Sequence, residues 1–167
     1  MIKPNEPFEL KKSIWTEADF DEMGWHDVHI HALAFQPDSF ELYLDIDYMF
    51  AWVDPEPPDT HYTFWLAPCT WLFTNVYDFK AEVDWGLGLE IEDVSRELIG
   101  KPKNAEYIRR EKEWRWVLAC QEGELSFTSV GFQQFVRQNP IRVSSQVFSW
   151  PQRKGVCFDK TEIEGNR

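Results

Sequence analysis

The chain has 167 residues, a length that suits one domain, and 43% of them are hydrophobic, so a sizeable core can be buried. Asp and Glu (29) outnumber Lys and Arg (17), and the formal net charge of −12 gives a field that repels phosphate backbones and anionic lipid. We therefore expect no direct binding to nucleic acid or to a membrane surface, whereas a basic protein or a cationic ligand would be attracted.

The three cysteines, Cys69, Cys120 and Cys157, are odd in number and lack the C-x-x-C spacing of a metal or redox pair. This usage predicts three reduced thiols in a reducing compartment. The first residues lack the apolar run of a signal peptide, and no stretch approaches the roughly 20 apolar residues of a membrane span. The sequence therefore predicts a cytoplasmic protein.

The chain begins with an extended lead-in over residues 1–14, followed by a short helix. Thr16 can cap the free amides at the start of this helix, and Gly24 can end it in the left-handed conformation. Strands are then predicted over residues 26–36, 40–50, 62–76, 79–85, 88–98, 107–121, 124–131 and 141–150. Residues 54–59 form a stiff, proline-rich loop, Pro68 is expected to bend or split its strand, and residues 132–138 fit either helix or strand.

Successive strands joined by short turns, with no long helices between them, predict an antiparallel meander. The expected fold is mainly β: one domain over residues 15–151, built as a curled sheet or a partly closed barrel or sandwich, with one short N-terminal helix. Strand residues should outnumber helix residues at least twofold. Residues 152–167 are polar and are expected to form a loose C-terminal tail.

The hydrophobic pattern also predicts the register of two hairpins, since one face of each strand must enter the core. In the later hairpin, a turn at Glu122-Gly123 places Gln121 opposite Glu124. One face of this hairpin is then expected to hold Trp114, Trp116, Leu118, Cys120, Leu125 and Phe127.

The first hairpin has two possible registers. A two-residue turn at Pro37-Asp38 would bury Asp45 and Asp47 among apolar side chains, whereas a three-residue turn over 37–39 avoids that cost, so we predict the latter. The core face is then expected to hold Val28, Ile30, Ala32, Ala34, Phe40, Leu42, Leu44, Ile46 and Tyr48. The opposite face is expected to hold Asp27, His29, His31, Glu41, Tyr43, Asp45 and Asp47, with Leu33 and Phe35 nearer the turn.

In this register His31 lies opposite Asp45 and His29 lies opposite Asp47, with Cβ atoms about 4.5–5.5 Å apart. These four residues are candidate ligands for a divalent metal such as zinc or manganese, which imidazole and carboxylate groups suit. Alternatively, an aspartate orients a histidine for acid–base catalysis, or the pairs are salt bridges on a solvated face, worth less than about 1 kcal/mol each. The whole candidate functional face comprises His26, Asp27, His29, His31, Asp45 and Asp47.

A second candidate site is a groove formed by Trp52, Glu56 and His61 around the proline-rich loop. Tryptophan joins a large apolar ring to a polar edge, which suits a binding surface, although the same ring could instead anchor the loop to the sheet.

Several segments resemble a family of small uncharacterised bacterial proteins. They are residues 20–27 (Phe-Asp-Glu-Met-Gly-Trp-His-Asp), 30–31, 41–48, 64–68 and 131–135. The start of the first strand, Trp25-His26-Asp27, is also similar to immunity-protein families of bacterial polymorphic toxin systems. The resemblance implies a bacterial origin and supplies no catalytic residues.

No nucleotide-binding loop, nucleophile elbow or zinc-protease motif occurs in the sequence. We therefore expect a non-enzymatic interaction protein that needs no cofactor and binds a protein partner, in particular a basic one, as an immunity-type inhibitor of a bacterial toxin would. The alternative is a metal-binding module or metal-dependent enzyme that uses His29, His31, Asp45 and Asp47. The oligomeric state is left open.

Overall fold

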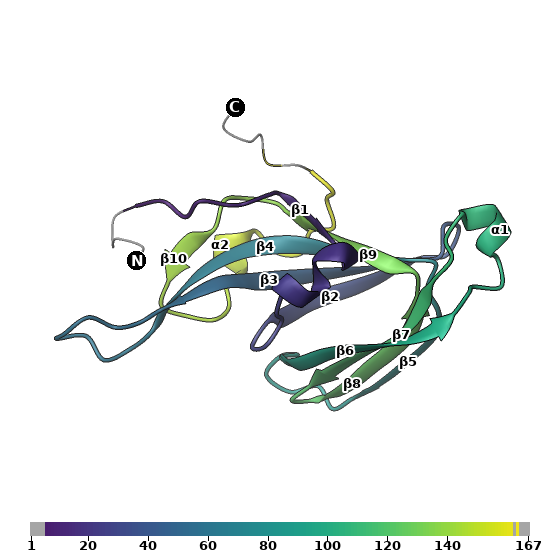
Figure 1. Cartoon of the computed structure of the whole chain (residues 1–167). Helices are drawn as coiled ribbons and strands as arrows, with labels where there is room; N and C mark the ends of the chain where they lie inside the picture. Colours follow the sequence, from purple (N-terminus) through teal and green to yellow (C-terminus); the bar gives the residue numbers. More distant parts are fainter. Residues whose placement is uncertain (1–5, 162, 164–167) are drawn as a thin grey trace.

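The computed structural model describes residues 6–161 and 163, and it consists of two antiparallel sheets that enclose one core (Figure 1). Strands take up 50% of the chain and helices 9%, and neither sheet closes into a barrel within the described residues. The expected mainly β, antiparallel fold is therefore confirmed, with two sheets as the arrangement. No helix in the described part of the chain is long and apolar enough to cross a membrane.

Sheet A has the strand order β1-β9-β4-β3-β2, and β10 pairs with one end of β4. Its strands are β1 (Ile14–Thr16), β2 (His29–Gln36), β3 (Glu41–Val53), β4 (Thr63–Thr74), β9 (Gly131–Val136) and β10 (Ile141–Val143). Sheet B has the order β5-β8-β7-β6. Its strands are β5 (Tyr77–Val83), β6 (Ile91–Gly100), β7 (Glu113–Cys120) and β8 (Gly123–Ser129).

Aromatic side chains dominate the core between the sheets. Trp71 and Phe73 of β4 and Trp116 of β7 are fully buried, and Trp25 stacks on Trp71 with ring centroids 4.9 Å apart. Such rings each bury a large apolar area, and their edge-to-face and stacked contacts add specific geometry. A smaller cluster on the outer face of sheet A consists of Met49, Phe64, Leu66 and Phe148.

Three short helices complete the fold: η1 (Glu17–Glu22), α1 (Ala105–Ile108) and α2 (Trp150–Arg153). The predicted N-terminal helix is therefore present, as a 3-10 helix, and Thr16 and Asp19 form a capping box at its start. It ends at Met23 in an extended conformation, so the expected left-handed cap at Gly24 is wrong.

Several predicted strand bounds differ from the structure. The strand expected over 107–121 begins only at residue 113, because α1 takes up 105–108. The strand expected over 141–150 ends at 143, and the ambiguous segment 132–138 is largely β9. Strand β4 runs through Pro68 without a break; there β9 has ended and β10 has not begun, so no ladder on that side requires the missing N–H.

The later hairpin keeps its predicted faces but not its predicted turn. Cys120 pairs with Gly123, and Leu118 pairs with Leu125, so the turn is Gln121-Glu122. The register differs from the predicted one by two residues, and a shift of two leaves every side chain on its face. Trp116, Leu118, Leu125 and Phe127 are accordingly buried together.

The first hairpin follows the predicted register only at its open end. His29 pairs with Asp47 and Ile30 with Ile46, as predicted, but a β-bulge at His31 then shifts the pairing by one residue, so that Ala32 pairs with Asp45. The turn is longer than predicted, with Gln36 opposite Glu41. The predicted His31–Asp45 pair is therefore wrong.

The same bulge corrects the predicted faces near the turn. Leu33 pairs with Leu44, and Phe35 contacts Phe79 of sheet B, so these two side chains lie toward the sandwich while Ala32 and Ala34 lie on the other face. The expected core set further along the hairpin is confirmed as buried: Val28, Ile30, Leu42, Leu44, Ile46 and Tyr48.

Residues 144–161, which we call the C-terminal strap, cross the outer face of sheet A. Phe148 packs in the outer cluster, the ring of Phe158 lies 6.2 Å from that of Tyr43, and the Asp159 carbonyl accepts a hydrogen bond from Thr70. Residues 153–159 of the predicted loose tail are therefore held by the domain, while residues 162 and 164–167 of that prediction lie outside the described residues.

Candidate functional site

The predicted His–Asp face is a buried ionic network rather than an open surface. Asp45 and Asp47 lie two residues apart on β3, so both point out of sheet A on the side that the strap covers, and both are fully buried. The side chain of Arg153, at the end of α2, is also fully buried and lies between them. Its Nη1 and Nη2 atoms donate to the two oxygens of Asp45 at 2.6 and 2.7 Å, and its Nη2 and Nε atoms donate to Asp47 at 3.1 and 3.2 Å.

Further donors complete the hydrogen bonding of both carboxylates. Arg137 donates to Asp45 at 2.7 Å, and the backbone amide of Cys157 donates to the same residue at 2.9 Å. The backbone amide of Phe148 lies 2.8 Å from Oδ2 of Asp47. The Nε2 atom of His31 lies 2.7 Å from that same oxygen, because the bulge at His31 turns its ring toward Asp47.

These contacts decide the ionisation of the network. Burial by itself would raise the pKa of Asp45, but hydrogen bonds from Arg153, the Cys157 amide and Arg137 outweigh it and hold that pKa below its usual range. Burial likewise opposes the charge of Arg153, and the bonds to Asp45 and Asp47 overcome it, so its pKa is raised. The charged forms of Asp45 and Arg153 are therefore the stable ones.

The network leaves little room for the predicted metal. All four carboxylate oxygens already accept hydrogen bonds from cationic or backbone donors, so a metal would have to displace guanidinium groups. His29 does not join the network: its nearest carboxylate is Glu90, with Nε2 and Oε2 3.8 Å apart. Within residues 6–161 and 163, no group of three or more His, Cys, Asp or Glu side chains is arranged to hold a metal ion.

His26 and Asp27 lie at the junction of the two sheets, away from the network. The Nδ1 atom of His26 is 3.0 Å from Asp27, and Gln146 of the strap donates to Asp27 at 3.1 Å. Burial and a hydrogen bond with Asp27 raise the pKa of Glu90, while burial and the neighbouring His31 lower the pKa of His29. Of the six residues of the predicted face, His31, Asp45 and Asp47 thus belong to the network and His26 and Asp27 to the junction, with His29 interacting electrostatically with both groups.

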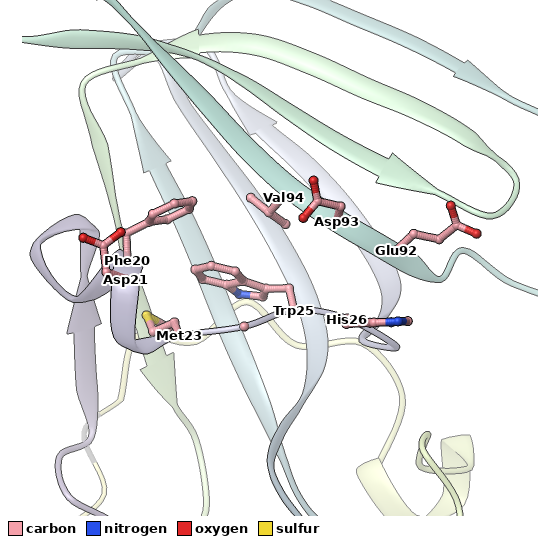
Figure 2. A pocket seen from close by; sticks show the side chains of 9 residues that line it. Phe20, Asp21, Met23, Trp25, His26, Glu92, Asp93 and Val94 are labelled. Atoms are coloured by element: carbon pink, nitrogen blue, oxygen red, sulfur yellow. The ribbon is translucent and has the colours of Figure 1, made fainter.

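A shallow pocket of about 380 Å³ lies beside this junction (Figure 2). The rings of Phe20 and Trp25 and the side chain of Val94 line its apolar part, and Asp21, Glu92, Asp93 and His26 surround it. In Figure 2 the carboxylates of Glu92 and Asp93 point away from the Trp25 ring. The pocket therefore combines a small apolar surface with a solvated acidic rim.

Trp52, Glu56 and His61 lie on the β3–β4 hairpin, which projects far beyond the two sheets (Figure 1). Trp52 is 53% exposed, and its ring contacts those of Tyr62 and Phe64 with centroids 5.6 and 5.2 Å apart. Glu56 and His61 are exposed near the tip. We call residues 50–65 the projecting hairpin.

Charge is distributed unevenly around this hairpin. Between Lys12 and Lys80 the sequence contains no Lys or Arg, while Asp54, Glu56 and Asp59 lie exposed at the tip. Arg142 of β10 donates to Thr63 at the base of the hairpin, while a group of basic residues lies around α1, at the opposite end of the molecule in Figure 1. They are Lys101, Lys103, Arg109, Arg110 and Lys112.

Sequence reasoning missed Arg137, Arg153 and Tyr62. Two carboxylates that alternate with core residues on one strand imply either an exposed face or buried partners, and the predicted partners were the neighbouring histidines or a metal rather than arginine. The signal that could have identified Arg153 is its setting: Ser149 precedes Trp150-Pro151, which is typical of a helix start, within a segment predicted to be loose.

No family model, no curated protein and no solved structure matches the chain. The resemblance to small bacterial proteins and to immunity families therefore stays a prediction.

Proposed function

We propose that the protein is an interaction domain whose projecting hairpin binds a positively charged site on a partner protein. The observation that carries the proposal is the hairpin itself, which combines exposed Trp52 and Tyr62 with three acidic residues and no basic one. Exposed aromatic residues commonly supply most of the binding energy at protein interfaces, and complementary charge accelerates association and selects the partner.

The shape of the hairpin supports a partner site that is concave. Its base is held by the pairing of β3 with β4, which has one irregularity between Met49 and Ala51, and by Phe50 and Trp65, which both pack against Phe8. An element that is already paired and packed loses less conformational entropy on binding than a loose loop does. An acidic projection of this kind suits a basic cleft, and the finer form of the proposal is an immunity-type inhibitor that occupies the active site of a toxin acting on an anionic substrate.

The test begins with a photo-reactive amino acid at position 56, introduced into the full chain in cells of the source organism. The cross-linked protein is identified by mass spectrometry, purified, and titrated with the wild-type chain by calorimetry at two salt concentrations. We expect a basic partner and an affinity that falls as salt rises, because exposed charges are screened.

Two matched triple variants decide whether the hairpin is the contact. The first variant neutralises the tip of the hairpin with Asp54→Asn, Glu56→Gln and Asp59→Asn. The second variant neutralises the same number of exposed acids on sheet B with Glu82→Gln, Glu97→Gln and Glu124→Gln. The first variant should raise Kd at least about tenfold, which is about 1.4 kcal/mol, and the second no more than about twofold. The proposal would be contradicted if both variants lowered the affinity for the partner equally, if the hairpin variant bound the partner as the wild type does, or if no protein were cross-linked.

A further inference from the structure

The two sheets have five edge strands among the described residues, and four of them carry features that prevent further pairing. β1 and β10 have only three residues each. β5 has a register irregularity between Tyr77 and Lys80 and exposes the charged residues Lys80 and Glu82, and β6 has two such irregularities together with exposed Glu92, Asp93 and Glu97. Short strands, bulges and charges are the usual devices that keep an edge from pairing with another chain.

β2 lacks these devices over its second half. Near its start, the backbone of the segment before β6 covers the edge: Ile30 donates to the Leu89 carbonyl at 2.9 Å, and the bulge follows at His31. Residues 32–36 continue as a regular strand that is paired with β3 on one side. Among the described strands none pairs with their other side, and the five residues include no charge and no proline.

Three large apolar side chains lie exposed along this open edge and its adjoining turn. Leu33 is 38% exposed, Phe35 51% and Phe40, in the adjoining turn, 61%. Phe35 is fixed by an edge-to-face contact with Phe79 of sheet B, with centroids 4.9 Å apart. An unpaired backbone beside apolar side chains is the arrangement that accepts an added strand, where main-chain hydrogen bonds give affinity and side chains give specificity.

We propose that residues 32–36 of β2 bind an extended segment of a basic protein, which adds to sheet A as a further strand. The surroundings favour a basic segment, because three carboxylates, Asp38, Glu41 and Asp78, lie next to the open edge in the chain or on β5, and they outnumber the cations Lys80 of β5 and Lys160, which lies over the Tyr43 ring. A second copy of the chain fits less well, since each copy carries a net charge of −12. This surface is separate from the projecting hairpin, so the proposal goes beyond the proposed function.

The experiment uses a short capped peptide that alternates Lys with Val as the probe, titrated into the full-length protein and followed by two-dimensional NMR of the backbone amides. We expect saturable shifts centred on residues 32–36, together with slower hydrogen exchange of amides in that segment. A peptide that alternates Glu with Val has the same strand propensity and opposite charge, and it should bind at least about tenfold more weakly.

Paired variants separate this edge from the rest of the surface. Leu33→Lys with Phe35→Lys installs the usual protective charges and should weaken peptide binding at least about tenfold. The control, Leu98→Lys with Ile99→Lys, changes two residues of β6 that are each 54% exposed and should have no more than about a twofold effect. Leu33→Thr with Phe35→Thr keeps strand propensity without adding charge, which guards against misfolding as the cause, and it should weaken binding by an intermediate amount.

Three results would overturn the proposal: shifts centred outside residues 32–36, equal binding of the acidic peptide, or peptide binding unchanged in the Leu33→Lys/Phe35→Lys variant. Self-association that is lost in that variant would also overturn it, because the edge would then belong to a second copy. The neutralised hairpin variant should bind the peptide as the wild type does, so failure of this proposal and failure of the hairpin proposal are distinguishable.

Discussion

At the scale of single residues, Arg153 is the group on which both buried carboxylates depend. It donates to Asp45 and Asp47 together, and its side chain is fully buried. Removing one partner of a buried ion pair leaves an uncompensated charge in a buried site. Substitution of Arg153 should therefore lower the free energy of unfolding strongly, even though the network as a whole contributes only modestly to it.

We predict that Arg153→Met lowers the free energy of unfolding by about 3–5 kcal/mol, measured by urea denaturation with tryptophan fluorescence. Arg153→Lys should lose less, since it keeps the charge but not the planar fork of donors. Arg142→Met removes an exposed arginine that bonds only Thr63 among the described contacts, and it should cost less than about 1 kcal/mol. A similar loss in the Arg142 and Arg153 variants would refute the role given to the buried pair.

Asp45 also predicts how stability depends on pH. Its pKa in the folded protein lies below the usual 3.8, so its stabilising contribution is present above about pH 4 and is lost as pH falls through the folded value. The free energy of unfolding should therefore fall less steeply between about pH 4 and pH 2 in Asp45→Asn than in the wild type. The exposed Asp59→Asn variant should retain the wild-type slope; equal slopes in all three proteins would contradict the expectation.

At the scale of elements, the strap and the β-bulge at His31 show which features of the fold could be predicted from the sequence and which could not. Alternation along residues 42–48 correctly separated the core face from the carboxylate face, because that pattern is local. The bulge at His31 was not predictable from alternation, since apolar residues on both sides of it satisfy either parity. The contact of Arg153 with Asp45 joins residues more than a hundred positions apart, and no local pattern reports it.

We expect the strap to be held chiefly by the ionic network. The amides of Phe148 and Cys157 donate to the buried carboxylates, so both should exchange slowly with solvent deuterium. In Arg153→Met, exchange over residues 144–161 should accelerate more than exchange in β3 and β4, as measured by amide-resolved exchange. Uniform acceleration throughout the domain would instead show that the strap and the sheets open as one unit.

At the scale of the whole molecule, both the shape and the charge distribution support the projecting hairpin as the binding element. The projecting hairpin lies at the acidic end of the molecule, and the basic residues around α1 lie at the other (Figure 1). The net charge of −12 predicted a basic partner, and the positions of Trp52, Glu56 and His61 around the proline-rich loop predicted a binding groove there. The predicted groove did not take account of the length of β3 and β4, which carries these residues away from the sheets.

The most direct test of the hairpin as the binding element is amide hydrogen exchange of the wild-type chain with and without the partner recovered through position 56. The account predicts that protection on binding is concentrated in residues 50–65 and is lost when the three acids of the tip are neutralised. Protection confined to sheet B, to the pocket beside Trp25 or to the segment around α1, with residues 50–65 exchanging as in the free protein, would contradict it.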